Sequence, residues 1–301
     1  MIVPTQQIFL PVLEKAGITL SVRREDMSHP VVSGNKFRKL KYNLLYAKQE
    51  GYSTLITFGG AFSNHILATA YAGKEHGFKT IGVIRGEELS GHTNENVTLS
   101  NARSLGMKLH FISRQEYRQK EESAFLARLK KLFGQFYLLP EGGTNALAIR
   151  GCSEILQAED RQFDLICAAV GTGGTLAGLI QASHPGQEVI GFPALKGGHL
   201  KKDICSFVDK SNWRLQSDFH FGGYAKINET LIAFINDFAK NTGIPLDPVY
   251  TGKMFYGILD MAGKGLFRRG SHILAIHTGG LQGIAGMNRR LEKKNLPLIN
   301  I

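Results

Sequence analysis

The chain has 301 residues, of which 43% are hydrophobic and 20% are charged, and its formal net charge is +11. This length fits one large α/β unit or two domains that share a cleft. No stretch approaches the roughly 20 uninterrupted apolar residues of a membrane helix, and the N-terminus shows no secretory signal pattern. We therefore expect a cytoplasmic protein with no membrane partner.

Short apolar runs alternate with longer amphipathic runs along the chain. The apolar runs predict strands buried on both faces, at residues 54–58, 80–84, 109–112, 164–170, 189–192 and 272–277. The amphipathic runs predict helices at residues 35–50, 63–76, 94–105, 116–133, 145–157, 173–182, 229–240, 254–264 and 280–291. This alternation predicts an α/β fold with parallel sheets, in which sites lie at the carboxyl ends of strands.

The positive charge is spread along the predicted helices. Lysines and arginines alternate with glutamates and apolar residues at 36–48, 114–131 and 289–294, a pattern typical of solvated helix faces. The charge favours the attraction of anionic metabolites. We therefore expect no nucleic-acid partner, and a basic protein that binds nucleic acid is kept only as an alternative.

Metal and disulfide chemistry are not indicated. Cys152, Cys167 and Cys205 are isolated from one another, and the sequence has neither a Cys-x-x-Cys pair nor the paired histidine spacing of a zinc site. We expect three buried thiols and no metal.

The first candidate site opens the helix predicted at residues 35–50. A glycine-asparagine turn is followed by Lys36, Arg38 and Lys39 in the first helical turn. Because the positive end of a helix dipole disfavours cations, an anion or covalent chemistry is expected to compensate them. A lysine in this place should have a lowered pKa, and its neutral amine can attack a carbonyl. The alternative is a solvated basic helix start.

The second candidate site, at residues 58–65, follows a predicted strand and opens a helix. Gly59 and Gly60 allow close backbone approach. Ser63 and Asn64 then present side chains and amides at a helix N-terminus, which suits a carboxylate or a phenolate oxygen. Plain N-capping by Ser63 is a compatible alternative.

The third candidate site, at residues 170–178, again runs from a strand through a glycine turn to a helix. Consecutive amides together with Thr172 and Thr175 predict a nest for a phosphate. A G-x-G-x-x-G frame that starts at Gly171 ends on Leu176, and the lysine of a P-loop is absent. A single monophosphate therefore fits better than a nucleotide, and a tight packing turn is the alternative.

Four polar residues near the C-terminal end lie next to turns that contain glycine or proline: Tyr224, Tyr250, Thr251 and Thr278. Tyrosine hydroxyls can act as acid or base groups, and a threonine can hydrogen-bond a ring nitrogen without charging it. Structural tyrosines with satisfied hydroxyls are the alternative.

Taken in this order, the segments resemble the family of 1-aminocyclopropane-1-carboxylate deaminases and D-cysteine desulfhydrases. These are fold type II enzymes, related to the tryptophan synthase β chain, that depend on pyridoxal phosphate (PLP). The resemblance spans most of the chain. Its motifs are GNK-x-RKL at 34–40, GG-x-x-SNH at 59–65, EGGTN at 141–145, GTGGTLAG at 171–178, YTGK at 250–253 and HTGG at 277–280.

The resemblance implies a role for each candidate residue. Lys36 is implied to hold PLP covalently as a Schiff base and to act in catalysis, and Lys39 to neutralise the PLP phosphate. The remaining implied cofactor contacts are Asn64 at the ring oxygen, Thr172, Gly173, Gly174 and Thr175 at the phosphate, and Thr251 and Thr278.

Substrate contacts are also implied. Ser63 lies beside the substrate carboxylate and relays a proton, with Asn64 and His65 as further substrate-binding residues. Tyr224 and Tyr250 flank the substrate as catalytic residues.

The implied architecture has two domains, each an open, mostly parallel twisted sheet flanked by helices. The small domain is expected at residues 44–150, and the large PLP-binding domain at residues 1–43 and 151–301. The resemblance also implies a homodimer that acts on a small amino acid.

The implied reaction depends on two departures within the family. The ring-opening branch generally has glutamate in the motif YEGK, where this chain has Thr251, and Thr278 lies in HTGG, where that branch also differs. Both favour D-cysteine desulfhydrase-like β-elimination to a keto acid, ammonia and sulfide. The alternatives are ring opening of 1-aminocyclopropane-1-carboxylate to 2-oxobutyrate and ammonia, other amino-acid chemistry such as racemisation or dehydration, and PLP binding without turnover.

A third departure lies next to the second candidate site. Ala61 and Phe62 replace the usual pair of a small apolar residue and glutamine before SNH. We expect Phe62 to narrow or reshape the substrate pocket.

Overall fold

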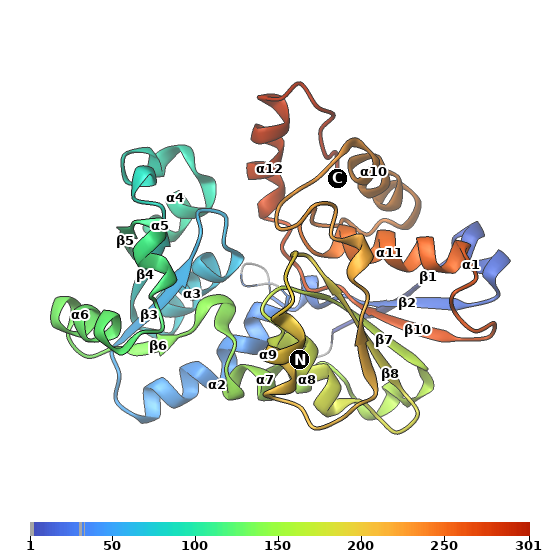
Figure 1. Cartoon of the computed structure of the whole chain (residues 1–301), viewed down its shortest axis with the longest axis horizontal. Helices are drawn as coiled ribbons and strands as arrows, with labels where there is room; N and C mark the ends of the chain where they lie inside the picture. Colours follow the sequence, from blue (N-terminus) through green and yellow to red (C-terminus); the bar gives the residue numbers. More distant parts are fainter. Residues whose placement is uncertain (1–2, 30–31, 33) are drawn as a thin grey trace.

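Two separate β-sheets organise the chain (Figure 1). The computed structural model describes residues 3–29, 32 and 34–301. Within these residues the larger sheet has the strand order β1-β2-β10-β7-β8-β9, and the smaller sheet has the order β5-β4-β3-β6. Neighbouring strands are parallel except for β1 and β2, which are antiparallel. The predicted α/β fold with mostly parallel sheets is confirmed.

The larger sheet is built from both ends of the chain. Its strands are β1 (Thr5–Ile8), β2 (Thr19–Arg23), β7 (Leu165–Val170), β8 (Glu188–Pro193), β9 (Trp213–Leu215) and β10 (His272–Ile276). Its first face packs on α1 (Pro11–Ala16), α10 (Glu229–Thr242), α11 (Thr251–Gly263) and α12 (Gly283–Glu292). Its second face packs on α7 (Ala146–Ser153), α8 (Gly174–Ala182) and α9 (Leu200–Cys205). The strands therefore bury both faces.

The smaller sheet is built from the middle of the chain. Its strands are β3 (Thr54–Gly59), β4 (Lys79–Arg85), β5 (Lys108–Ile112) and β6 (Tyr137–Leu139). One face packs on α5 (Arg114–Arg118) and α6 (Ser123–Phe133). The other face packs on α2 (Asn35–Gln49), α3 (Asn64–His76) and α4 (Val97–Ser104).

Helix α2 joins the two sheets, as its course between them in Figure 1 shows. It crosses α7 so closely that a Cβ at Gly151 would lie 2.0 Å from the carbonyl oxygen of Arg38. Because α2 packs on both parts of the molecule, the domain boundaries at residues 44 and 150 stay a prediction.

Each of the six strands predicted from the apolar runs is present, but the prediction was wrong about one helix and about the burial of one strand. The helix predicted at residues 116–133 is two helices, because the backbone is extended at Glu122 (φ −72°, ψ 138°) and α6 starts after it. Strand β5 lies at a sheet edge and is only partly buried, not buried on both faces. The sequence also missed β1, β2, β6, β9, α1 and α9, which span three to six residues each.

The three thiols do not share one environment. Cys152 and Cys167 are buried, as predicted, but Cys205 is exposed. The reason is that α9 buries only Ile204 and turns its other residues outward. Among the described helices, none is long and apolar enough to cross a membrane.

Candidate active site

Gly34 holds the start of α2 against the end of β10. Its φ is +76°, and a Cβ there would lie 2.0 Å from the carbonyl oxygen of Thr278. The Gly34 amide donates to the Glu25 carbonyl at 2.8 Å, and the Asn35 amide donates to the Thr278 carbonyl at 3.3 Å. Only a residue without a side chain permits this approach. The glycine therefore brings the first turn of α2, with Lys36, to the carboxyl end of β10.

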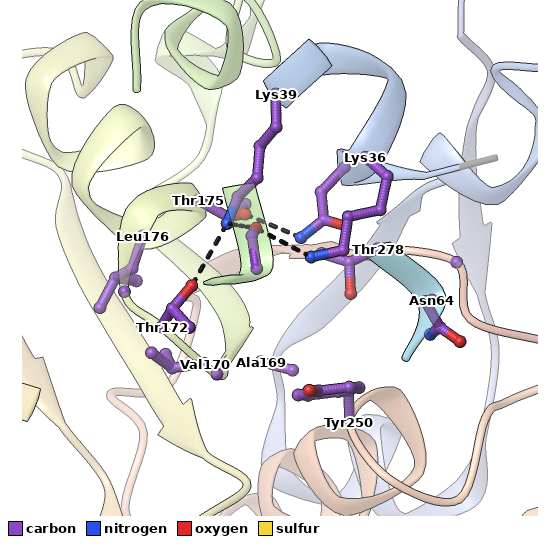
Figure 2. Close-up of a pocket in the computed structure, with 15 residues that line it drawn as sticks. Lys36, Lys39, Asn64, Ala169, Val170, Thr172, Thr175, Leu176, Tyr250 and Thr278 are labelled. Carbon is purple, nitrogen blue, oxygen red and sulfur yellow. Dashed lines mark hydrogen bonds between the residues drawn. The ribbon is translucent and has the colours of Figure 1, made fainter. Parts of the chain in front are cut away.

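Lys36 extends from this turn into a cavity (Figure 2). Its Nζ donates to the Gly142 carbonyl at 3.2 Å. Burial of the ammonium, followed by the positive charge of Lys39, lowers the pKa of Lys36 well below its ordinary value. The direction agrees with the lowered pKa expected from the sequence, but its main cause is burial and not the helix dipole. A lowered pKa favours the neutral amine that attack on a carbonyl requires.

The other two cations of the turn meet different partners. Arg38 forms a buried bidentate ion pair with Glu25, at 3.0 and 2.9 Å, so the chain itself compensates this charge. Lys39 instead donates to the Gly142 carbonyl and the Thr144 hydroxyl, each at 3.0 Å. Burial lowers its pKa as well. Lys39 is therefore placed to receive an anion.

The glycine turn before α8 faces Lys39. Gly173 has φ +84°, and no side chain caps α8, which leaves the amides of its first turn for a ligand or solvent. The Thr172 hydroxyl lies 3.5 Å from Lys39 Nζ, and Thr175 accepts a hydrogen bond from Asn35 Nδ2 at 2.8 Å. A cation, hydroxyls and uncapped amides thus converge on one small volume, which suits a phosphate group.

The start of α3 forms another wall of the cavity. Ser63 caps the helix by accepting from the Ile66 amide at 3.4 Å, and its own O–H is still able to donate. Asn64 points toward the cavity in Figure 2. His65 is 1% exposed, and neither of its ring nitrogens has a hydrogen-bond partner within the described residues. Burial, with two nearby lysines, lowers its pKa well below the usual value, so the ring is neutral.

Two tyrosines stand opposite α3. The rings of Tyr224 and Tyr250 meet edge to face, with centroids 6.2 Å apart. Burial raises the pKa of Tyr250 well above its ordinary value and also raises that of Tyr224. Lys253 fixes the loop before Tyr224 by donating to the carbonyls of His220 at 2.9 Å and Gly223 at 2.7 Å. Both phenols are therefore held in place and stay protonated at neutral pH.

Most of these groups line two adjoining cavities that share part of their lining, while Arg38, Thr144 and Lys253 line neither. The inner cavity surrounds Lys39 and is lined by Asn35, Lys36, Thr172, Gly173, Thr175 and Thr278, among others. The outer cavity, of about 400 Å³, is lined among others by Phe62, Ser63, His65, Arg85, Tyr224 and Arg290. Four side chains line both cavities: Lys36, Asn64, Thr172 and Tyr250.

A family model described as "Pyridoxal-phosphate dependent enzyme" matches residues 1–279. This chain belongs to the PLP-dependent enzymes. The family assignment agrees with the buried lysine and the phosphate-sized turn of the inner cavity, and it establishes PLP as the cofactor.

Individual relatives narrow the position within the family. A Thermotoga maritima protein provisionally named a 1-aminocyclopropane-1-carboxylate deaminase is 34% identical over 96% of this chain and 97% of its own. An Arabidopsis thaliana mitochondrial protein named bifunctional D-cysteine desulfhydrase/1-aminocyclopropane-1-carboxylate deaminase is 31% identical, over 89% of this chain and 74% of its own. A solved structure of an ACC deaminase homologue has a TM-score of 0.81 and 29% identity, and covers 97% of this chain and 94% of that one.

The inner cavity of this PLP-dependent enzyme fits the cofactor. The Lys36 amine suits the aldehyde, and Lys39 with the α8 turn suits the phosphate. Thr278 lines the same space with a hydroxyl, which can face a ring nitrogen without charging it. Asn64 lines it as well, where a ring oxygen can accept from its amide. These roles stay predictions.

Two residues predicted to contact PLP do not line the cavity among the described residues. Thr251 is fully buried, and its hydroxyl donates to Asp247 at 2.7 Å while accepting from the Asp247 amide at 2.9 Å. The structure therefore does not support direct cofactor contact by this side chain. Its hydrogen bonds with Asp247 instead stabilise the start of α11. Gly174 is absent from the lining too, but its implied role uses the backbone amide in the uncapped first turn of α8, and this role stays a prediction.

Several site residues were missed by the reasoning from sequence. Gly142 accepts from both site lysines, and Thr144 joins Lys39 to the glycine turn. Asp247 accepts the Tyr250 amide at 2.9 Å, and Lys253 holds the opposite loop. The signal was available, because the first two lie in EGGTN and the last lies in YTGK.

Proposed function

We propose that this PLP-dependent enzyme catalyses β-elimination from a small D-amino acid, with D-cysteine as the model substrate. In the overall reaction, D-cysteine and one water give pyruvate, ammonia and hydrogen sulfide. The bond between Cβ and sulfur breaks and the Cα proton is removed. No oxidant or reductant is needed, because the electron pair released at Cα expels the sulfur.

The observation that carries this proposal is the lining of the outer cavity. Lys36 lines it together with the start of α3 on one side and the tyrosine pair on the other. The helix N-terminus at Ser63 and Asn64 suits a carboxylate. A small amino acid bound there would present its Cα to the Lys36 amine and its side chain to Tyr250.

The protein side chains divide the proton transfers. PLP, when bound, supplies the electron sink for a carbanion at Cα. The Lys36 Nζ takes the Cα proton, for which its lowered pKa is suited. The Tyr250 hydroxyl, whose raised pKa keeps it protonated, donates to the departing sulfur. Ser63 and the α3 amides hold the carboxylate, and the buried His65 excludes water behind them.

Ring opening of 1-aminocyclopropane-1-carboxylate is the second candidate, favoured by the names of the relatives described above. Two residues, Thr278 and Thr251, favour elimination instead. Thr278 offers the cofactor a hydroxyl and not an acid. Thr251 donates to Asp247, so a glutamate at this position would bring a second carboxylate against a buried one.

The test is a keto-acid assay on the purified holoenzyme with D-cysteine, L-cysteine and 1-aminocyclopropane-1-carboxylate, with sulfide measured in parallel. We expect D-cysteine to give pyruvate and sulfide with a higher kcat/KM than the cyclopropane substrate gives 2-oxobutyrate. The reverse ranking would assign ring opening. A protein that carries PLP but turns over no substrate in a wider panel of β-substituted amino acids would be a binding protein.

We also propose a homodimer, from the resemblance, and a cytoplasmic location. Light scattering on the purified holoenzyme should give twice the chain mass of 33.1 kDa. A monomeric mass would refute the dimer.

A further inference from the structure

The outer cavity carries features that elimination from D-cysteine does not use. One face of α12 lines it at a helical spacing, with Gly283, Gly286, Met287 and Arg290. Phe62 packs on this face, because a Cβ at Gly286 would lie 3.1 Å from the Phe62 ring. The departure at position 62 thus builds an aromatic wall between the α3 loop and α12.

A second arginine enters the same cavity from the smaller sheet. Arg85 ends β4, and its Nη2 would lie 3.6 Å from a Cβ at Gly60. Its guanidinium lies over the buried Tyr117 ring, 5.6 Å from the centroid. Contact with an aromatic face orients a guanidinium without neutralising it. Arg85 is therefore held by Tyr117 beside the loop that carries Phe62.

The charges around this wall are unbalanced. Among the side chains that the structure describes, which leave out those of residues 92–95, no carboxylate forms an ion pair with Arg85 or Arg290. The two carboxylates that line the cavity are already engaged, since Glu141 pairs with Lys120 at 3.4 Å and Asp247 accepts from Thr251 and Tyr250. Two guanidinium groups thus border a cavity whose acids have other partners.

We propose that Phe62, Arg85 and Arg290 form a subsite for an anionic group on the side chain of the amino-acid substrate, such as a carboxylate or a sulfonate. This inference rests on the proposed function, which places the α-carboxylate at Ser63 and Asn64. The arginines then contact a second anion, and the Phe62 ring covers the apolar part of the side chain. Planar guanidinium groups bind such oxyanions in a bidentate manner.

Ligand binding tests this subsite without turnover. D-alanine and D-aspartate differ by one carboxylate, and neither carries a good leaving group at Cβ. Calorimetric titration of the holoenzyme at low salt should show D-aspartate binding at least about tenfold more tightly than D-alanine. Arg85→Gln and Arg290→Gln should each remove about tenfold of this preference and leave the D-alanine affinity within about twofold, while Arg85→Lys retains part of it.

Matched controls use arginines outside the cavity. Arg289 is the exposed neighbour of Arg290 on α12, and Arg128 pairs with Glu116 on α6. Arg289→Gln and Arg128→Gln should keep the full preference. The L-enantiomers are titrated in parallel, so that the preference for the anionic ligand is measured for both configurations at Cα.

The outcomes separate the two proposals. Equal affinities for the neutral and the anionic ligand overturn the subsite. An equal loss of both affinities in Arg85→Gln and Arg290→Gln also overturns it, because the arginines would then bind the α-carboxylate. If the preference is present while D-cysteine gives no pyruvate, the subsite stands and the proposed elimination fails.

Discussion

The inner and outer cavities differ in how their walls are made. The inner cavity lies between the first turn of α2, which Gly34 holds against the Thr278 carbonyl, and the glycine turn before α8, where Ile204 packs on Gly173. The outer cavity is walled by side chains from both sheets and from α12, including the exposed Phe62 and Tyr224. A glycine with close neighbours, such as Gly34, tolerates little change, whereas long side chains such as Phe62 and Arg85 can be altered one at a time.

We therefore expect cofactor binding and substrate choice to depend on different parts of the structure. At a tightly packed glycine such as Gly34, a larger residue must displace its neighbours, which costs folding free energy as well as activity. In the outer cavity an arginine or phenylalanine can be exchanged while the fold remains. The predictions below test whether the two regions respond in these ways, beginning with the largest expected effect.

Lys36→Ala should abolish the function of the inner cavity. We expect turnover to fall by about 10²–10⁴-fold or more, because the residue that moves the Cα proton is removed. The variant should also lose the PLP adduct that borohydride reduction traps on the protein. Lys41→Ala is the matched control, since Lys41 lies on the same helix and pairs with Glu154 at 2.7 Å. If Lys36→Ala still formed the adduct in wild-type yield, Lys36 would not be the residue that holds PLP.

Gly34→Ala should destabilise the protein at the start of α2, beside the inner cavity. Positive φ alone costs about 1–3 kcal/mol, and the added Cβ would also collide with the Thr278 carbonyl. Gly51→Ala is the control, because Gly51 also has a positive φ, +72°, but has nothing within 4 Å of its Cβ position. Urea unfolding should give the larger loss of unfolding free energy for Gly34→Ala. Equal losses would mean that the close approach to β10 contributes nothing.

The pH dependence of stability gives the smallest effect. Because the pKa of Lys36 is lowered in the folded state, the unfolded chain binds more protons between this lowered pKa and about 10.4. Stability therefore rises with pH across this window. In cofactor-free protein, the melting temperature of wild type minus that of Lys36→Met should increase from pH about 7 to about 10.

The control for this pH series is Lys41→Met. The hydrogen bond to Glu154 raises the pKa of Lys41, so its contribution to stability is present below the unfolded pKa and is lost only above it. The melting temperature of wild type minus that of Lys41→Met should therefore stay level up to pH about 10. If the two melting-temperature differences changed with pH in the same way, the Lys36 amine would not be buried as described.

The sequence by itself determined six of the ten described strands and much of the inner cavity. Buried strands and amphipathic helices have periods that can be read locally, and the inner site is made of short motifs at their junctions. Lys36, Lys39 and the turn at Gly173 could be found in this way, because the needs of a helix N-terminus are local.

Only the tertiary structure decided which partner each polar group uses. Arg38 is compensated by Glu25 and not by a ligand, and Thr251 bonds Asp247 instead of facing the cavity. Phe62 meets Gly286 across more than 200 residues of sequence. Such contacts depend on how distant elements pack, and no local period or propensity encodes them. The outer cavity is built from these contacts, so its arginine pair became visible only in the folded chain.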